Sequence, residues 1–280
     1  MLRLGIVGTE SSHCAEFLTF LRSPEGASAA QLAAVWPGAG EPVEGADIVG
    51  RPEELPGRVN AVALFARDAR EHLELAAPLL SAGLRVFIDK PLAASVADAE
   101  RLLELAARHG GAVTSFSALR WAPEVLAWSR EVARARREGT LLEVGAAGGA
   151  NPSDPHAGAW FYGVHPVDML ASAVGESLLT GEATLTHQPG LVESHWSVDG
   201  TELGLRLEAN QAAPFRVWWA ARDGSRKETV VPVGAGYFTT AAERILAFLS
   251  GNPSVGPEEC LAVVARTQEL VATLRPWPET

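Results

Sequence analysis

The chain has 280 residues and a mass of 29.6 kDa, enough for one large domain or two ordinary ones. Hydrophobic residues make up 47% and charged residues 20%, which excludes a disordered chain. The net charge of −11 argues against a protein that binds nucleic-acid phosphates, and it gives no sign of attraction to anionic membranes. We therefore expect neither a nucleic acid nor a membrane as partner.

The two cysteines, Cys14 and Cys260, lie far apart and lack metal-ligand spacing, so the sequence excludes a disulfide framework and favours a cytoplasmic protein. No apolar run approaches the ~20 residues that a membrane-spanning helix needs. The apolar start of the chain is too short for a signal peptide and runs into a strand pattern.

Up to about residue 120, strand-like runs alternate with helical patterns, which predicts a parallel sheet covered on both faces. We expect strands at 2–7, 31–36, 60–65, 85–88 and 112–116, and helices at 12–21, 69–81 and 96–109. Gly83 and Gly110 are placed to end two of these helices, and Ser95 with Asp98 to begin one. Residues 22–58 are rich in Gly, Pro and Ala and predict mainly loops.

After residue 120 the pattern predicts a mostly antiparallel sheet with few helices. Strands are expected at 141–147, 179–186, 192–198, 203–207, 215–220 and 228–233, and helices at 122–136, 238–250 and 257–274. Asp199-Gly200 and Asp223-Gly224 are strong hairpin signals. We expect an α/β chain of two domains, 1–120 and 121–280, with the final helix packing back on the first.

The turn after the first strand reads Gly5-Ile-Val-Gly8-Thr-Glu-Ser-Ser-His13. In an open parallel sheet, a dinucleotide pyrophosphate binds at this turn, on the helix N-terminus. The usual G-x-G-x-x-G positions fall on Gly8, Glu10 and His13, so only the first glycine is kept. A Glu10 carboxylate repels pyrophosphate unless it points away. A tight turn capped by Ser11 or Ser12 explains the same residues without a nucleotide.

The second strand ends Val35-Trp36-Pro37, without the acidic residue that binds ribose hydroxyls in such folds. The sequence therefore does not distinguish NAD from NADP.

Downstream motifs carry a family resemblance. Asp89-Lys90-Pro91 follows the strand at 85–88, Ser115-Phe-Ser-Ala-Leu-Arg120-Trp-Ala-Pro123 follows the last strand of the first half, and Gly163-Val-His165 leads into an apolar helical run. These segments, with Glu138-Gly139-Thr-Leu-Leu-Glu-Val-Gly145, resemble the Gfo/Idh/MocA oxidoreductases, which include glucose-fructose oxidoreductase and inositol dehydrogenase. The family has Glu-Lys-Pro at the first motif and Asp-x-Gly-x-His at the third; here the family Asp falls on Phe161.

The resemblance implies a Rossmann domain that binds NAD or NADP, followed by an α+β domain with an open sheet through which homo-oligomers form. It implies a small-molecule substrate: a sugar, a cyclitol, a related polyol or a keto form. Cofactor contacts are expected from the first turn and the ends of the fourth and fifth strands: Gly8, Thr9, Glu10, Ser11, Ser12, His13, Ala66, Arg67, Asp89 and Lys90. Substrate contacts are expected from Arg120, Trp160, Tyr162 and His165.

Three residues are the expected catalytic groups. A histidine's ordinary pKa of about 6.5 suits His165 to take and return a proton. A lysine ammonium stabilises a developing alkoxide, which is the role that the resemblance gives Lys90. Asp168 lies three residues after His165 on the same helix face, where it orients the ring or contacts substrate.

Each residue also has a structural explanation. A lysine after a strand is usually solvated, an isolated histidine is usually structural, and an Asp in the first turn of a helix favours the helix dipole. Arg120 either anchors substrate or bridges the domains. No His or Cys pair has metal-ligand spacing, so no metal is expected.

Two alternatives stay open. The degraded glycine motif, the missing acid after the second strand and Phe161 favour a catalytically silent relative that binds a ligand and regulates. A third reading keeps the fold and uses the cofactor for elimination or glycoside cleavage.

Overall fold

The computed structural model describes residues 1–234 and 236–274, which form two compact units. The first unit contains Met1–Phe116 and Gly236–Cys260, and the second contains residues 117–234 and 261–274. The domain boundary expected at residue 120 thus lies at Phe116/Ser117. Residues 236–260, expected in the second domain, are part of the first unit.

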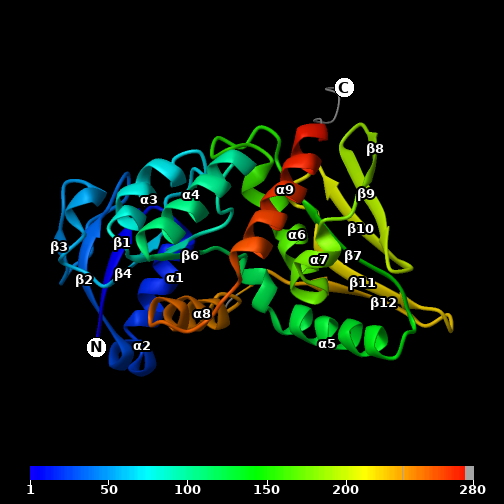
Figure 1. Cartoon of the computed structure of the whole chain (residues 1–280), viewed down its shortest axis with the longest axis horizontal. Helices are drawn as coiled ribbons and strands as arrows, with labels where there is room; N and C mark the ends of the chain where they lie inside the picture. The colour runs from blue at the N-terminus through cyan, green and yellow to red at the C-terminus, as the bar shows by residue number, and fades with distance from the viewer. Residues whose placement is uncertain (235, 275–280) are drawn as a thin grey trace. The chain divides into compact units, whose positions relative to one another are not determined.

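The first unit is built on a six-stranded parallel sheet (Figure 1). Its strands are β1 (Leu2–Val7), β2 (Ala30–Trp36), β3 (Asp47–Ile48), β4 (Ala61–Leu64), β5 (Arg85–Ile88) and β6 (Ala112–Thr114). The strand order β3-β2-β1-β4-β5-β6 is the Rossmann order, as expected. The order reverses between β1 and β4, and ligands of such sheets bind in the crevice at the carboxyl ends of those two strands.

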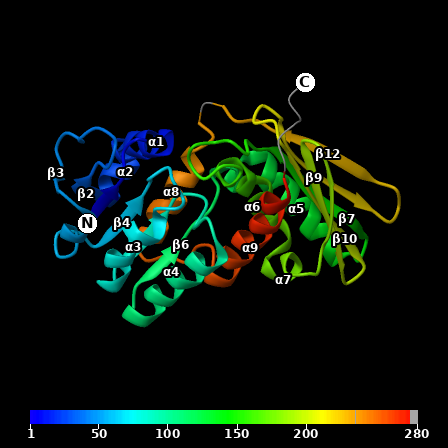
Figure 2. The same ribbon diagram turned by 90° about the horizontal axis from the view of Figure 1, so that it is seen from above.

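Helices cover both faces of this sheet. α3 (His72–Ser81) packs on α4 (Val96–His109), and α1 (Ser12–Leu21) packs on α8 (Thr239–Leu249). Figure 2 shows the two pairs on opposite sides of the strands. The expected caps are confirmed: Ser11 and Ser95 accept hydrogen bonds from backbone N–H groups of their helices, and Gly83 and Gly110 have φ of 76° and 71°.

Besides the expected strand β2, the stretch expected to be mainly loops contains three short elements: α2 (Pro24–Ala29), β3 and the 3₁₀ helix η1 (Pro52–Glu54). Local signals begin α2, since Ser23 caps it and Pro24 occupies its first turn. β3 has two residues, too few for any periodic pattern.

The second unit contains a six-stranded sheet of order β12-β11-β7-β10-β9-β8. Its strands are β7 (Leu141–Gly149), β8 (Thr184–Gln188), β9 (Leu191–Val198), β10 (Thr201–Glu208), β11 (Phe215–Ala221) and β12 (Arg226–Val231). Only the β7–β10 pair is parallel, so the expected mostly antiparallel sheet is confirmed. The helices α5 (Pro123–Arg137) and α6 (Trp160–Val174) pack on β7 and β11. The remaining elements are the 3₁₀ helix η2 (Ala118–Trp121), α7 (Glu176–Leu179) and α9 (Pro257–Thr273).

Two expectations in this half are wrong. The strand expected at 179–186 begins only at Thr184, because α7 buries Leu178 and Leu179 and the carbonyl of Leu178 accepts from Trp196 Nε1 at 2.6 Å. α6 begins at Trp160, so Asp168 lies in the middle of the helix and not in its first turn.

Among residues 1–234 and 236–274, no helix has the length and apolar character needed to cross a bilayer.

Candidate functional site

The β1–α1 turn is tied to the segment that follows β2. Gly8 has a φ of +80°, and a Cβ placed on it would lie 2.6 Å from the backbone nitrogen of Ala66, just after β4. The N–H of Gly8 donates to Trp36 O at 2.9 Å, and the Thr9 hydroxyl donates to Glu41 O at 2.8 Å. Only glycine fits this first position of the motif, because both its φ and the close approach of β4 exclude a side chain.

Glu10 occupies the second position of the motif and turns its side chain towards β4. Its Oε1 accepts from the backbone N–H of Arg67 at 3.0 Å. Its Oε2 is buried and has no hydrogen-bond partner among the described residues. The Glu10 carboxylate therefore connects the residues that follow β1 and β4, across the crevice where the strand order reverses.

His13 occupies the third position and forms a buried cluster with Asp89 and Tyr237. Its Nδ1 lies 2.9 Å from both Asp89 carboxylate oxygens, and its Nε2 lies 2.7 Å from the Tyr237 hydroxyl. Burial alone would raise the pKa of Asp89; the charge and hydrogen bond of His13, with the charge of Lys90, outweigh it and hold that pKa below its usual value. The Asp89 carboxylate is therefore ionised at neutral pH.

Lys90 follows Asp89 at the carboxyl end of β5 and is 6% exposed, so it is not an ordinary solvated surface lysine. The backbone next to it is held by His72, whose Nδ1 lies 2.9 Å from Pro91 O and whose Nε2 lies 2.9 Å from Ala66 O. The Lys90–Pro91 peptide bond is cis. His72 thus fixes the segment that presents Lys90.

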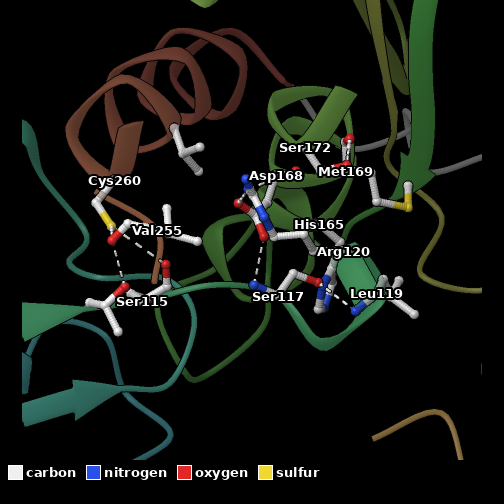
Figure 3. Close-up of polar contacts among 12 residues, drawn as sticks. Ser115, Ser117, Leu119, Arg120, His165, Asp168, Met169, Ser172, Val255 and Cys260 are labelled. Carbon is white, nitrogen blue, oxygen red and sulfur yellow. Dashed lines mark hydrogen bonds and ion pairs between the residues drawn. The ribbon is translucent and has the colours of Figure 1, made fainter. Parts of the chain in front are cut away.

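A second buried cluster, in the second unit, is centred on Ser117 (Figure 3). The Ser117 hydroxyl shares a 2.6 Å hydrogen bond with His165 Nδ1, and the Ser117 N–H donates to Asp168 Oδ2 at 2.7 Å. Arg120 Nη1 donates to Asp168 Oδ1 at 2.8 Å. His165 is 5% exposed and Asp168 is 2% exposed. Ser117 thus contacts the His165 ring at Nδ1.

Aromatic residues of α6 and β11 lie near this cluster. The rings of Tyr162 and Phe215 lie 5.9 and 5.2 Å from the His165 ring. Phe161 packs against Tyr162 and against His156, at 4.9 and 5.8 Å. Trp160 occupies the first position of α6 and is half-buried.

The structure therefore brings the expected residues together in two groups. One group, in the first unit, joins the β1–α1 turn to Ala66, Arg67 and Asp89; the other, in the second unit, joins Arg120, His165 and Asp168.

Sequence reasoning missed Ser117, Tyr237 and Phe215. Ser117 lies inside the motif at 115–123, and its place in that motif could have marked it as a site residue. Tyr237 lies 224 residues from His13, and no local pattern marks it. Among the described residues, no group of three His, Cys, Asp or Glu side chains is placed to hold a metal ion.

The residues of the first unit fit a nicotinamide dinucleotide. Gly8 lets β1 and β4 approach closely, α1 presents its N-terminus, and the ammonium-bearing Lys90 is held at the end of β5. The Glu10 carboxylate, in contrast, has the wrong charge for a pyrophosphate.

Comparison with known proteins agrees with this geometry. Residues 2–116 match the family model GFO_IDH_MocA, described as "Oxidoreductase family, NAD-binding Rossmann fold". The fold is similar to that of a Gfo/Idh/MocA family oxidoreductase from Vibrio cholerae, at 17% identity and a TM-score of 0.72, over 97% of each chain.

Two further similar structures are dehydrogenases by name. The WlbA dehydrogenase from Thermus thermophilus, solved in complex with NAD and UDP-GlcNAcA, has 18% identity and a TM-score of 0.71, over 100% of this chain and 97% of that chain. A putative myo-inositol dehydrogenase from Sinorhizobium meliloti has 15% identity and a TM-score of 0.72, over 98% of this chain and 97% of that one. The resemblance predicted from the sequence is thereby confirmed: residues 2–116 match the model of an oxidoreductase family with an NAD-binding Rossmann fold.

Proposed function

We propose that the chain is an NAD(P)-dependent oxidoreductase that transfers hydride between a nicotinamide cofactor and a CH–OH group of a sugar, cyclitol or related polyol, or its keto form. The observation that carries the proposal is the buried cluster of Ser117, His165, Asp168 and Arg120, which holds an imidazole in one orientation. The dehydrogenase relatives, one of them solved with NAD and a nucleotide sugar, support the substrate class.

His165 is the proposed acid–base residue. Its Nε2 takes the hydroxyl proton as the alcohol is oxidised and returns it when the carbonyl is reduced. Ser117 positions the ring through Nδ1. Asp168 accepts a hydrogen bond from the Ser117 N–H and so holds Ser117 in place beside His165. It also forms an ion pair with Arg120. A nicotinamide dinucleotide, which the β1–α1 turn and the end of β5 would hold, would supply the hydride chemistry.

Lys90 is the proposed electrophilic group. Its ammonium stabilises the negative charge that develops on the reacting oxygen, and burial strengthens that interaction because little water competes for it. Asp89 and the His72-bound backbone of Pro91 position it.

The test begins with cofactor binding. The purified, cofactor-stripped protein is titrated with NADH and with NADPH, following nicotinamide fluorescence. Saturable binding of either supports the proposal and identifies the preferred cofactor. A polyol screen then compares the protein with Lys90→Met and His165→Ala, which we expect to lose at least about 100-fold in turnover while their unfolding midpoints stay close to that of the unmodified protein. Unchanged turnover in either variant contradicts the role assigned to that residue.

A catalytically silent, regulatory relative is the second candidate. Two observations favour it: the Glu10 carboxylate in the crevice, and Phe161 where the family has Asp. It predicts no binding of either nicotinamide below about millimolar concentration, where the binding free energy is only ~4 kcal/mol.

We also propose a homo-oligomer assembled through the second sheet, in the cytoplasm. Four side chains of β9 and β10 are exposed: His195, Ser197, Glu202 and Arg206.

A further inference from the structure

The Glu10 side chain crosses the crevice between β1 and β4. Its Oε1 accepts a hydrogen bond from the Arg67 N–H at 3.0 Å. Its Oε2 is buried without a hydrogen-bond partner among the described residues. That second oxygen lies 3.2 Å from the position of a Cβ on Gly8. The carboxylate is thus folded over the one glycine of the motif that the chain keeps.

The backbone around Glu10 is also closely packed. A Cβ on Gly40, in the segment after β2, would lie 2.6 Å from the backbone nitrogen of Glu10 and 2.3 Å from the Thr9 hydroxyl. The Thr9 N–H donates to Pro37 O at 3.1 Å. The N–H groups of Gly8 and Thr9, at the start of a turn that presents such groups to phosphate in dinucleotide-binding folds, are therefore bonded to carbonyls of Trp36 and Pro37, and the carboxylate of the next residue is bonded to the N–H of Arg67.

We propose that Glu10 is an internal competitor for the dinucleotide pyrophosphate: its carboxylate holds the anion position of the crevice and weakens the binding of nicotinamide dinucleotides until it is displaced. This inference rests on the proposed function, since it concerns the affinity of the same cofactor site. Two negative groups repel each other, and the repulsion is strong where water is excluded. A pyrophosphate must therefore displace the Glu10 side chain from Arg67 or bind beside its charge.

The charge and the hydrogen bond of Glu10 can be separated. A glutamine keeps an oxygen that accepts from Arg67 N–H and removes the negative charge; an alanine removes both. If Glu10 serves only to satisfy the Arg67 N–H, Glu10→Gln leaves the dinucleotide affinity unchanged. If Glu10 competes with pyrophosphate, both substitutions tighten binding.

The experiment is a titration of the full chain with NADH and NADPH, by nicotinamide fluorescence and by calorimetry, in the unmodified protein, Glu10→Gln and Glu10→Ala. Glu16→Gln is the matched control, since Glu16 lies on α1 and is exposed, and the substitution changes the net charge by the same amount. Thermal unfolding followed by circular dichroism confirms that each variant is folded.

We expect Glu10→Gln and Glu10→Ala to bind the preferred dinucleotide at least about tenfold more tightly than the unmodified protein, and Glu16→Gln to bind within about twofold of it. Equal affinities for the unmodified protein and both Glu10 variants overturn the competitor role and leave the proposed function standing. Absence of binding in all four proteins overturns the proposed function and this inference with it.

Discussion

The Asp89 carboxylate is the buried charge on which the first-unit cluster depends. It is 7% exposed, yet it is held ionised by the His13 ring, which in turn contacts the Tyr237 hydroxyl. The ring bridges the two groups, with Nδ1 2.9 Å from the Asp89 carboxylate and Nε2 2.7 Å from the Tyr237 hydroxyl. The cluster replaces the third glycine of the motif by a chain of hydrogen bonds that fixes α1 against the end of β5.

The pH dependence of stability follows from the lowered pKa of Asp89. Burial alone would raise that pKa; the charge and hydrogen bond of His13 and the charge of Lys90 bring it below the unfolded value of about 3.9. A carboxyl whose pKa is lower in the folded state stabilises the fold above its unfolded pKa and loses that contribution as the pH falls through the folded pKa. We expect Asp89→Asn to be less stable than the unmodified protein above about pH 5, with the difference shrinking below pH 4.

Urea unfolding between pH 3 and pH 7 measures this difference. Asp47→Asn is the control, because Asp47 is exposed and its nearest cation, Arg58 Nη1, lies 4.0 Å away. A difference between Asp89→Asn and the unmodified protein that stays constant down to pH 3 contradicts the assignment.

At the scale of single residues, the sequence identified the separate members of both clusters and not their pairings. His165, Asp168 and Arg120 are in place, and so are His13 and Asp89. The pairings join residues 48, 76 and 224 positions apart, and no local pattern encodes such distances. Ser117 caps η2 through a local bond from the Leu119 N–H, but its contacts with His165 and Asp168, 48 and 51 positions away, are tertiary.

The β1–α1 turn is the element on which the crevice is built. Gly8 combines a φ of +80° with a close approach to Ala66, whereas Gly45 has a φ of +84° and nothing within 4 Å of a Cβ placed on it. The two glycines therefore form a matched pair: alanine at either position costs the left-handed backbone conformation, and only alanine at Gly8 also collides with β4. We expect Gly45→Ala to destabilise by about 1 kcal/mol and Gly8→Ala by roughly 2–4 kcal/mol.

Urea unfolding at one pH compares the two variants, and a dinucleotide titration follows. Gly8→Ala should also lose saturable binding of NADH and NADPH, while Gly45→Ala keeps it. Equal destabilisation by the two substitutions would show that the approach of β4 to Gly8 does not constrain the turn.

Elements with strong end signals are the ones that the sequence predicts to the residue: β1, α1, β5 and α4. Ser11, Ser95 and Gly110 supply hydrogen-bonding or left-handed ends that operate locally. The strand expected at 179–186 is wrong because its apolar leucines are buried equally well by a helical turn, and a short apolar run does not separate the two. The parallel β7–β10 pair is likewise set by the whole sheet and not by either strand alone.

At the scale of the whole molecule, the proposed catalytic groups belong to different units, Lys90 to the first and His165 to the second. The chain passes between the units at residue 116 and again in the segments after β12 and within α9. A simple division at residue 120 misses this exchange, because composition and periodicity do not show that residues 236–260 return to the first unit.

The outward face of the second sheet is where the proposed oligomer is tested. Trp218 lies over Gly145 and Gly204 and donates from Nε1 to Glu143 at 2.8 Å, while Arg206 pairs with Glu193 at 2.7 Å. A two-fold interface buries the same patch on both copies, so one substitution on this face reverses a charge on each side of the interface. We expect Arg206→Glu to place a second carboxylate opposite Glu193 and to weaken association at least about tenfold.

Light scattering coupled to size-exclusion chromatography gives the mass of each variant across a range of protein concentrations. Arg134→Glu, on α5, is the control: it reverses the same charge on an exposed side chain of the element that packs on the other face of the sheet. An oligomer through the outward face predicts a lower mass for Arg206→Glu and an unchanged mass for Arg134→Glu. An unmodified protein that is monomeric at every concentration, or an Arg206→Glu variant of unchanged oligomeric mass, contradicts assembly through this face. Since the exposed residues here are mainly charged, the association should also weaken as the salt concentration rises.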